Sequence, residues 1–89
     1  MLNGRQRAYL RSLANTLKPI TQIGKDGVTE GFLDQLDAML DSRELVKVTI
    51  LETAGLDAKE TANALCKALR AEFVQAIGFK FTLYRKNVD

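Results

Sequence analysis

The spacing of hydrophobic and polar residues along the chain predicts seven short elements. Helical spacing, with apolar residues recurring at three and four, occurs in residues 3–16, 30–44 and 58–69. Short runs rich in β-branched or aromatic residues, as in strands, occur at 19–23, 45–51, 73–77 and 79–84. We therefore expect one small α/β domain over residues 1–89, of order α-β-α-β-α-β-β, with helices packed on a four-stranded mixed sheet.

The first helix is predicted to bury one apolar stripe, with Tyr9 at its edge. The stripe consists of Leu10, Leu13, Ala14 and Leu17. Pro19 cannot continue a helix and disfavours helical geometry at the residue before it. We therefore expect the helix to end at Lys18.

The other two helices have recognisable start signals. Thr29 is a plausible N-cap for the second, and Asp57, with Glu60 three residues later, resembles a capping box for the third. The second helix should bury Phe32, Leu33, Leu36, Met39 and Leu40. The third should bury Ala58, Thr61 or Ala62, Leu65 and Leu69, with Cys66 beside them as a core residue.

The strands alternate in a way that predicts one buried face of the sheet. Val46, Val48 and Ile50 should lie on the buried side of their strand. Lys47 would then lie on an open face, if the helices cover only one side. In the last strand Phe79, Phe81 and Leu83 alternate with Lys80, Thr82 and Tyr84, and we expect the aromatic residues at 73, 79 and 81 to belong to the core.

Composition limits the possible functions. The 89 residues include no histidine and one cysteine, so the chain has no internal disulfide, and neither a zinc site nor a histidine-activated nucleophile is expected. No cofactor is indicated, and we expect a protein that is not an enzyme. The sequence shows no membrane-spanning run or signal peptide, so we expect a soluble, cytoplasmic protein. It does not indicate an oligomeric state.

Charge is strongly segregated along the chain. Residues 1–25 contain five cations and no acid, a net charge of +5. Residues 26–60 contain nine acids and three cations, a net of −6, and residues 61–89 contain five cations and two acids, a net of +3. A basic surface can attract a polyanion even when the whole protein carries only +2.

The sequence Gly24-Lys25-Asp26-Gly27 is the strongest candidate site. Glycines lack a Cβ and can adopt positive φ, so the amides between them can approach a phosphate closely, and the following helix adds its free N–H groups. A simple tight turn is the alternative. Asp26 should repel a phosphate unless its carboxylate points away, caps the second helix, or accepts a hydrogen bond from a base or a 2′-hydroxyl.

Two surfaces flank this candidate. Arg7, Arg11 and Lys18, at spacings of four and seven, share a face if the first helix or its direct extension reaches Lys18, and they form either an anion-binding surface or a solvated one. The second helix carries an acidic stripe formed by Glu30, Asp34, Asp37, Asp41 and Glu44. This stripe either repels nucleic acid from that side or docks a basic protein.

The chain resembles a known family in six ordered stretches. These are Leu13–Ala14, Leu17–Ile20, Ile23–Glu30, Glu44–Val48, Val74–Gly78 and Leu83–Arg85. They are similar to the CRM domain, the chloroplast RNA-splicing and ribosome-maturation module, whose stand-alone bacterial form is the YhbY family. The resemblance covers nearly the whole chain and implies a fold similar to the C-terminal domain of translation initiation factor three.

The resemblance also implies RNA as the partner. Bacterial members associate with precursors of the large ribosomal subunit, and the family's GxxG loop, here Gly24 to Gly27, is held to contact RNA. We therefore expect binding of ribosomal RNA or large-subunit precursors, with ribosomal proteins as further partners, rather than a protein-docking adaptor that acts through the acidic helix. The expected RNA-binding residues are Gly24, Lys25, Asp26, Gly27, Arg7, Arg11, Lys18, Lys47, Arg85 and Lys86. Many bacterial members continue with a basic tail beyond the last strand, so we expect weaker binding by a chain that stops at 87–89.

Overall fold

The computed structural model describes residues 2–87 and has the expected order of elements. Its elements are α1 (Gly4–Ala14), β1 (Thr21–Ile23), α2 (Glu30–Arg43), β2 (Leu45–Ile50), the short 3-10 helix η1 (Glu52–Ala54), α3 (Ala58–Leu69), β3 (Glu72–Ile77) and β4 (Lys80–Tyr84). The predicted α/β class and the order α-β-α-β-α-β-β are confirmed, and η1 is an addition. The last two residues of the expected chain end, 88 and 89, lie outside the described residues.

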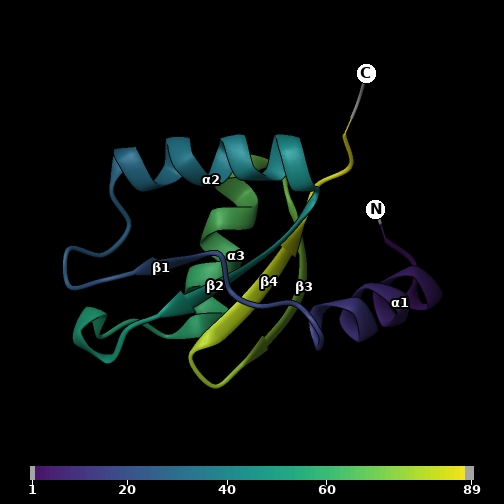
Figure 1. Ribbon diagram of the computed structural model, residues 1–89, viewed down its shortest axis with the longest axis horizontal. Helices are drawn as coiled ribbons and strands as arrows, with labels where there is room; N and C mark the ends of the chain where they lie inside the picture. Colours follow the sequence, from purple (N-terminus) through teal and green to yellow (C-terminus); the bar gives the residue numbers. More distant parts are fainter. Residues whose placement is uncertain (1, 88–89) are drawn as a thin grey trace.

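The four strands form one mixed sheet in the order β1-β2-β4-β3. β1 runs parallel to β2, whereas β2 pairs with β4 and β4 with β3 in antiparallel fashion. Figure 1 shows α3 behind the sheet and α2 along its upper edge, while α1 lies apart from both at the right-hand end of the molecule. The loop between β1 and α2 projects at the end of the long axis opposite α1 (Figure 1).

The main core lies between the sheet and helices α2 and α3. Val46, Val48 and Ile50 of β2 are buried there, as their alternation predicted. Leu36 and Leu40 of α2 are fully buried against them. On α3 we predicted that either Thr61 or Ala62 is buried, and both are. The predicted N-cap of α3 is confirmed, because the side chain of Asp57 accepts a hydrogen bond from the N–H of Glu60 at 2.9 Å.

Helix α1 packs on the opposite face of the sheet, rotated from its predicted orientation. Leu10 and Ala14 are buried against Val74, which a β-bulge between Phe73 and Gln75 turns toward the helix. The expectation that Leu13 and Leu17 belong to the buried stripe is wrong, because they remain 38% and 36% exposed. Only Leu10 and Ala14 of α1 are buried, because the helix covers only one end of this face.

Helix α1 ends four residues before the predicted limit at Lys18. Both the N–H and the hydroxyl of Thr16 donate to the carbonyl oxygen of Leu13, at 3.1 and 2.9 Å. These bonds, together with the N–H of Leu17 donating to the oxygen of Ala14 at 3.2 Å, tighten the chain into a turn. Local side-chain bonding near Thr16, and not Pro19, therefore terminates the helix.

Burial along β4 departs from the predicted alternation at two positions. Phe81 and Leu83 are buried, as expected, but Phe79 is 53% exposed because it lies in the turn of the β3–β4 hairpin, next to Gly78 with its φ of +60°. Thr82, predicted to face solvent, is fully buried. The segment around the end of α1 covers that part of the sheet, which the alternation of a single strand cannot reveal.

Replacing Thr82 by valine should stabilise the protein by about 1 kcal/mol. Among the described residues, the Thr82 hydroxyl has no hydrogen-bond partner although it is buried, and such a group loses its hydration without compensation. Urea unfolding of Thr82→Val against wild type measures the change. The exposed Thr53→Val should shift stability by less than about 0.5 kcal/mol. A destabilised Thr82→Val protein would show that the hydroxyl has a partner in solution.

Cys66 is a partly buried residue of the core edge, as predicted. Burial, together with the nearby negative charge of Glu72, raises the pKa of its thiol from 9.0 to about 11. Since the thiolate is the reactive form, alkylation by iodoacetamide at pH 8 should be about a hundredfold slower in the folded protein than in the unfolded chain. Because folding raises this pKa, stability is retained below pH 9 and declines as the pH rises toward 11. Equal alkylation rates would contradict the assignment of Cys66 to the core.

Candidate functional site

Residues Gly24 to Gly27 form a tight turn between β1 and α2. The N–H of Gly27 donates to the carbonyl oxygen of Gly24 at 2.9 Å, and Gly27 has a φ of +71°, which favours glycine. Gly24 does not need positive φ, and a Cβ added there would meet only the Cδ1 of Leu51 at an ordinary 3.9 Å. The fold therefore requires glycine at 27 but leaves the position at 24 open to a ligand that approaches the backbone.

Lys25 and Asp26 occupy the exposed tip of this turn. Within residues 2–87 the N–H groups of both residues donate no hydrogen bond, and Lys25 forms no ion pair. The turn therefore presents unbonded donors and one unpaired cation to solvent. A ligand with phosphate oxygens could accept from both.

The turn leads directly into the N-terminus of α2. Thr29 caps this helix, as predicted: its hydroxyl accepts from the N–H of Phe32 at 3.1 Å, and its carbonyl from the N–H of Leu33 at 3.0 Å. Asp26 is therefore not the cap. In the described part of the chain the N–H groups of Glu30 and Gly31 have no acceptor. They add two donors and the positive end of the helix dipole next to the turn.

The basic residues of α1 lie at the other end of the molecule, whose Cα atoms extend 35 Å along the long axis (Figure 1). Arg11 is exposed, whereas Arg7 is half-buried beside the stripe of Leu10 and Ala14. Because the helix ends at Ala14, Lys18 lies on the exposed segment that crosses from α1 to β1 and does not share a helical face with the two arginines. The cations are thus distributed along the molecule, with Lys18 between α1 and the turn in sequence.

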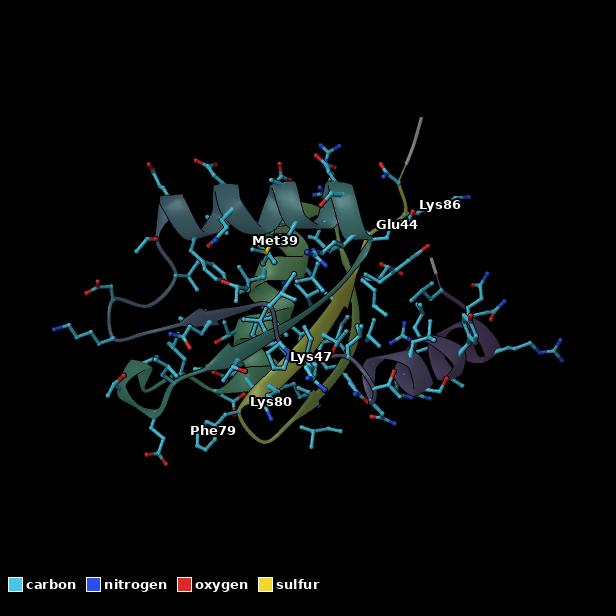
Figure 2. All side chains as sticks on the ribbon, viewed as in Figure 1. Met39, Glu44, Lys47, Phe79, Lys80 and Lys86 are labelled. Carbon is cyan, nitrogen blue, oxygen red and sulfur yellow. The ribbon has the colours of Figure 1, made fainter. Side chains whose placement is uncertain are left out.

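Lys47 does not point freely from an open face of the sheet. Its ammonium group donates to the carbonyl oxygens of Ala14 at 3.0 Å and Leu17 at 3.3 Å. These are terminal carbonyls of α1 and the following turn, which a lysine can satisfy. Figure 2 shows Lys47 near the middle of the sheet. The expectation of an open face at Lys47 is wrong, because the end of α1 covers it.

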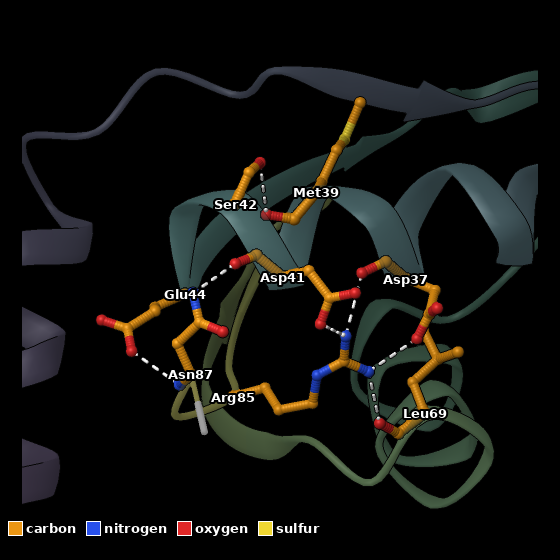
Figure 3. A network of polar contacts seen from close by, with 8 residues as sticks. All are labelled: Asp37, Met39, Asp41, Ser42, Glu44, Leu69, Arg85 and Asn87. Atoms are coloured by element: carbon orange, nitrogen blue, oxygen red, sulfur yellow. Dashed lines mark hydrogen bonds and ion pairs between the residues drawn. The ribbon is translucent and has the colours of Figure 1, made fainter. Parts of the chain in front are cut away.

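Arg85 is held by the acidic face of α2. Its guanidinium donates to the carboxylates of Asp37 at 2.7 Å and Asp41 at 2.8 Å, and also to two backbone oxygens, of Leu69 at 2.8 Å and Asp37 at 2.9 Å (Figure 3). The hydrogen bond to Asp37 raises the pKa of Arg85 above its usual range. The side chain is only 18% exposed, while the neighbouring Lys86 is exposed. The structure thus gives Arg85 a role in joining the chain end to α2 and α3.

This network also changes the meaning of the acidic stripe. Asp37 and Asp41 are paired with Arg85, and the carboxylate of Glu44 accepts from the N–H of Asn87 at 2.6 Å. Three of its five acids therefore bind the C-terminal segment. The sequence carried a signal for this arrangement, since acids four residues apart on a helix can together bind one arginine.

The part of the chain that the structure describes supports neither a metal site nor a membrane-spanning helix. Residues 2–87 contain no group of three or more His, Cys, Asp or Glu side chains placed to hold a metal ion. No helix there has the length and apolar character needed to cross a membrane.

Comparison with known proteins gives consistent matches along the whole chain. Residues 2–85 match the family model of the CRS1 / YhbY (CRM) domain. The chain is 41% identical to the Probable RNA-binding protein YqeI of Bacillus subtilis, a match covering 100% of this chain and 93% of the relative. It is 34% identical to the Probable RNA-binding protein PA4753 of Pseudomonas aeruginosa, over 97% of this chain and 83% of the relative.

A solved structure has the same fold. The solution structure of the protein SAV1595 from Staphylococcus aureus, described as a candidate RNA-binding protein, superposes with a TM-score of 0.80 at 42% identity. The match covers 100% of this chain and 93% of that one.

Proposed function

This chain belongs to the CRS1 / YhbY (CRM) domain family, and from that premise we propose that it binds RNA through the turn at Gly24–Gly27 and the basic residues beside it. The RNA we propose is ribosomal RNA, in precursors of the large subunit. The names of its relatives, which describe RNA-binding proteins, support the choice of RNA. We propose further that it acts in the cytoplasm as a binding protein and not as an enzyme.

The observation that carries the proposal is the set of free donors at one end of the molecule. The N–H groups of Lys25, Asp26, Glu30 and Gly31 have no acceptor among residues 2–87. Phosphate oxygens accept hydrogen bonds from backbone N–H groups and helix N-termini, and the ammonium of Lys25 adds a charge contact. Asp26, at the exposed tip, then has two roles open to it: it points away, or it accepts from a base or a 2′-hydroxyl.

The remaining cations extend this contact along the molecule. Arg11 and the half-buried Arg7 lie on α1, and Lys18 lies on the segment that leads toward β1. A stacked strand advances about 3.4 Å per nucleotide, so a phosphate backbone that followed the 35 Å long axis would span roughly ten nucleotides. An RNA of at least about ten nucleotides is therefore a better match in size than a single nucleotide.

The other predicted cations are given different roles in the proposal. Lys47 and Arg85 are engaged inside the protein, so we assign them to positioning α1 and the chain end rather than to holding phosphates. Lys86 is exposed next to Arg85 and remains available for RNA. The adaptor function through the acidic stripe loses support because Asp37 and Asp41 are already paired.

A salt titration tests the proposal. Binding of the full chain to a folded ribosomal RNA fragment is measured by fluorescence anisotropy from about 50 to 200 mM salt. A protein that contacts phosphates should lose affinity linearly in log salt, with a slope of roughly −0.7 to −0.9 per contact. We expect a slope equivalent to about three or four contacts, from Lys25, Lys18 and α1. Absence of binding at 50 mM salt, or affinity independent of salt, would refute it.

A further inference from the structure

A shallow groove of about 360 Å³ lies where β1 meets β2, and it is lined by Pro19, Ile20, Thr21, Gln22 and Thr49. Thr49 follows Lys47 by two residues, so its side chain lies on the sheet face that carries α1. Gln22 is paired with Thr49 and therefore shares this face. Thr21 is paired with the buried Val48, so its side chain points to the other face. The polar side chains that reach the groove are thus those of Gln22 and Thr49.

These two side chains have no hydrogen-bond partner within the protein. Gln22 is exposed and Thr49 is half-buried, and among residues 2–87 neither side chain donates or accepts a hydrogen bond. Polar side chains nearer α1 on the same face are engaged: the ammonium of Lys47 holds the end of α1, and the amide of Gln75 donates to Asn15 at 3.1 Å. The fold therefore leaves an amide and a hydroxyl at the groove, and each can both donate and accept.

Two exposed cations adjoin the groove. Lys18 directly precedes Pro19, the first of the lining residues, and Lys80 is paired with Thr49 on the neighbouring strand. Within residues 2–87 neither lysine forms an ion pair, and no acid lines the groove. Because adjacent strands lie about 4.8 Å apart, the ammonium-bearing chain of Lys80 starts within roughly 10 Å of Gln22. The groove and its surroundings are therefore polar and positively charged.

The groove lies along the path between two parts of the molecule that the proposed function uses. β1 runs from the segment after α1 to the projecting loop that contains the turn at Gly24–Gly27 (Figure 1). Gln22 precedes Gly24 by two residues, about 7 Å along an extended chain. A phosphate backbone that passes from Lys18 to the turn would therefore follow β1 past the groove.

We propose that this groove binds a ribose of the RNA and selects RNA over DNA through the 2′-hydroxyl. The proposal rests on the function proposed above. The 2′-hydroxyl donates and accepts hydrogen bonds, and it is the group by which a protein can tell RNA from DNA. The amide of Gln22 and the hydroxyl of Thr49 supply its partners. Lys18 and Lys80 pair with the neighbouring phosphates.

The lining of the groove favours a sugar over a base or a protein partner. No aromatic residue lines it, so it offers no ring on which a base could stack. Pro19 and Ile20, which is 37% exposed, provide a small apolar wall for the C–H groups of a sugar. A stable protein interface needs about 800 Å² from each partner and an apolar centre, which five mostly polar lining residues do not supply. The lysines alone cannot discriminate, because RNA and DNA carry the same phosphates.

The test compares hairpins of one sequence that differ at the 2′ position. Fluorescence anisotropy measures binding of the full chain to an RNA hairpin, to the matching DNA hairpin, and to a 2′-fluoro RNA hairpin, which keeps the A-form without the hydroxyl. Wild type should prefer the RNA hairpin to the other two about tenfold, since two hydrogen bonds depend on the 2′-hydroxyl. Thr49→Val removes the hydroxyl and keeps the shape of the side chain, and Gln22→Met removes the amide and keeps its length. Each variant should bind the RNA hairpin about fivefold more weakly than wild type and bind the other two hairpins normally.

Matched controls remove the same groups elsewhere. Thr53→Val on η1 and Gln35→Met on α2 change exposed residues outside the groove, and both should bind all three hairpins like wild type. Normal binding of the DNA hairpin by Thr49→Val and Gln22→Met shows that these variants are folded. Equal affinity of wild type for the three hairpins would overturn this inference and leave the function of the Gly24–Gly27 turn intact. So would groove variants that bind the RNA hairpin like wild type, or that lose affinity for all three hairpins by the same factor. Failure of wild type to bind any hairpin would refute both proposals.

Discussion

Replacing Lys25 by alanine should weaken binding to a folded ribosomal RNA fragment about fivefold to tenfold and flatten the salt dependence by about one phosphate contact. Lys25 is exposed at the tip of the turn and unpaired within residues 2–87, so its loss removes a charge without disturbing the protein. Anisotropy titrations at several salt concentrations measure both quantities.

Two control variants sharpen this result. Lys67→Ala removes an exposed lysine on α3 and should leave both affinity and slope within error of wild type. Asp34→Ala tests the acidic stripe at an exposed residue that, unlike Asp37, is not paired with Arg85. If Asp34→Ala abolished association with ribosomal particles while Lys25→Ala had no effect, protein docking through α2 would replace RNA binding through the turn.

Replacing Arg85 by alanine should destabilise the fold by about 2 kcal/mol, because four hydrogen bonds that join the chain end to α2 and α3 are lost. The estimate stays at the low end for charged groups, since Asp37 and Asp41 are 51% and 69% exposed and regain water. For a domain of this size the melting temperature should fall by about 10 °C. Thermal unfolding followed by circular dichroism measures the change.

Lys86→Ala is the matched control for Arg85, because it removes the next cation along the chain, which has no ion pair among the described residues. Its melting temperature should stay within about 2 °C of wild type. If Arg85→Ala were as stable as Lys86→Ala and bound RNA more weakly, Arg85 would belong to the RNA contact and not to the fold.

Features set by neighbouring residues in sequence were predictable. The alternation of β2 placed Val46, Val48 and Ile50 in the core, and the caps at Thr29 and Asp57 fixed the starts of α2 and α3. Each of these depends on contacts within a few residues. The turn at Gly24–Gly27 was equally visible, because few residue types form one.

Features set by packing between distant segments could not be predicted from the sequence. Whether α1 exposes Leu13 or buries it depends on which end of the sheet it covers, and the burial of Thr82 depends on the path of residues after α1. Arg85 and Lys47 were predicted as RNA contacts from charge alone. The structure pairs them with groups 16 to 48 positions away in sequence, which no local pattern specifies.

The most direct test of the central claim is an NMR titration of the ¹⁵N-labelled chain with a folded ribosomal RNA fragment, followed at each backbone amide. We predict the largest chemical-shift changes at Lys25, Asp26, Glu30 and Gly31, whose N–H groups have no acceptor within residues 2–87. Smaller chemical-shift changes should occur at Lys18 and Arg11. Changes confined to the outer face of α2, with the turn unaffected, would contradict the account.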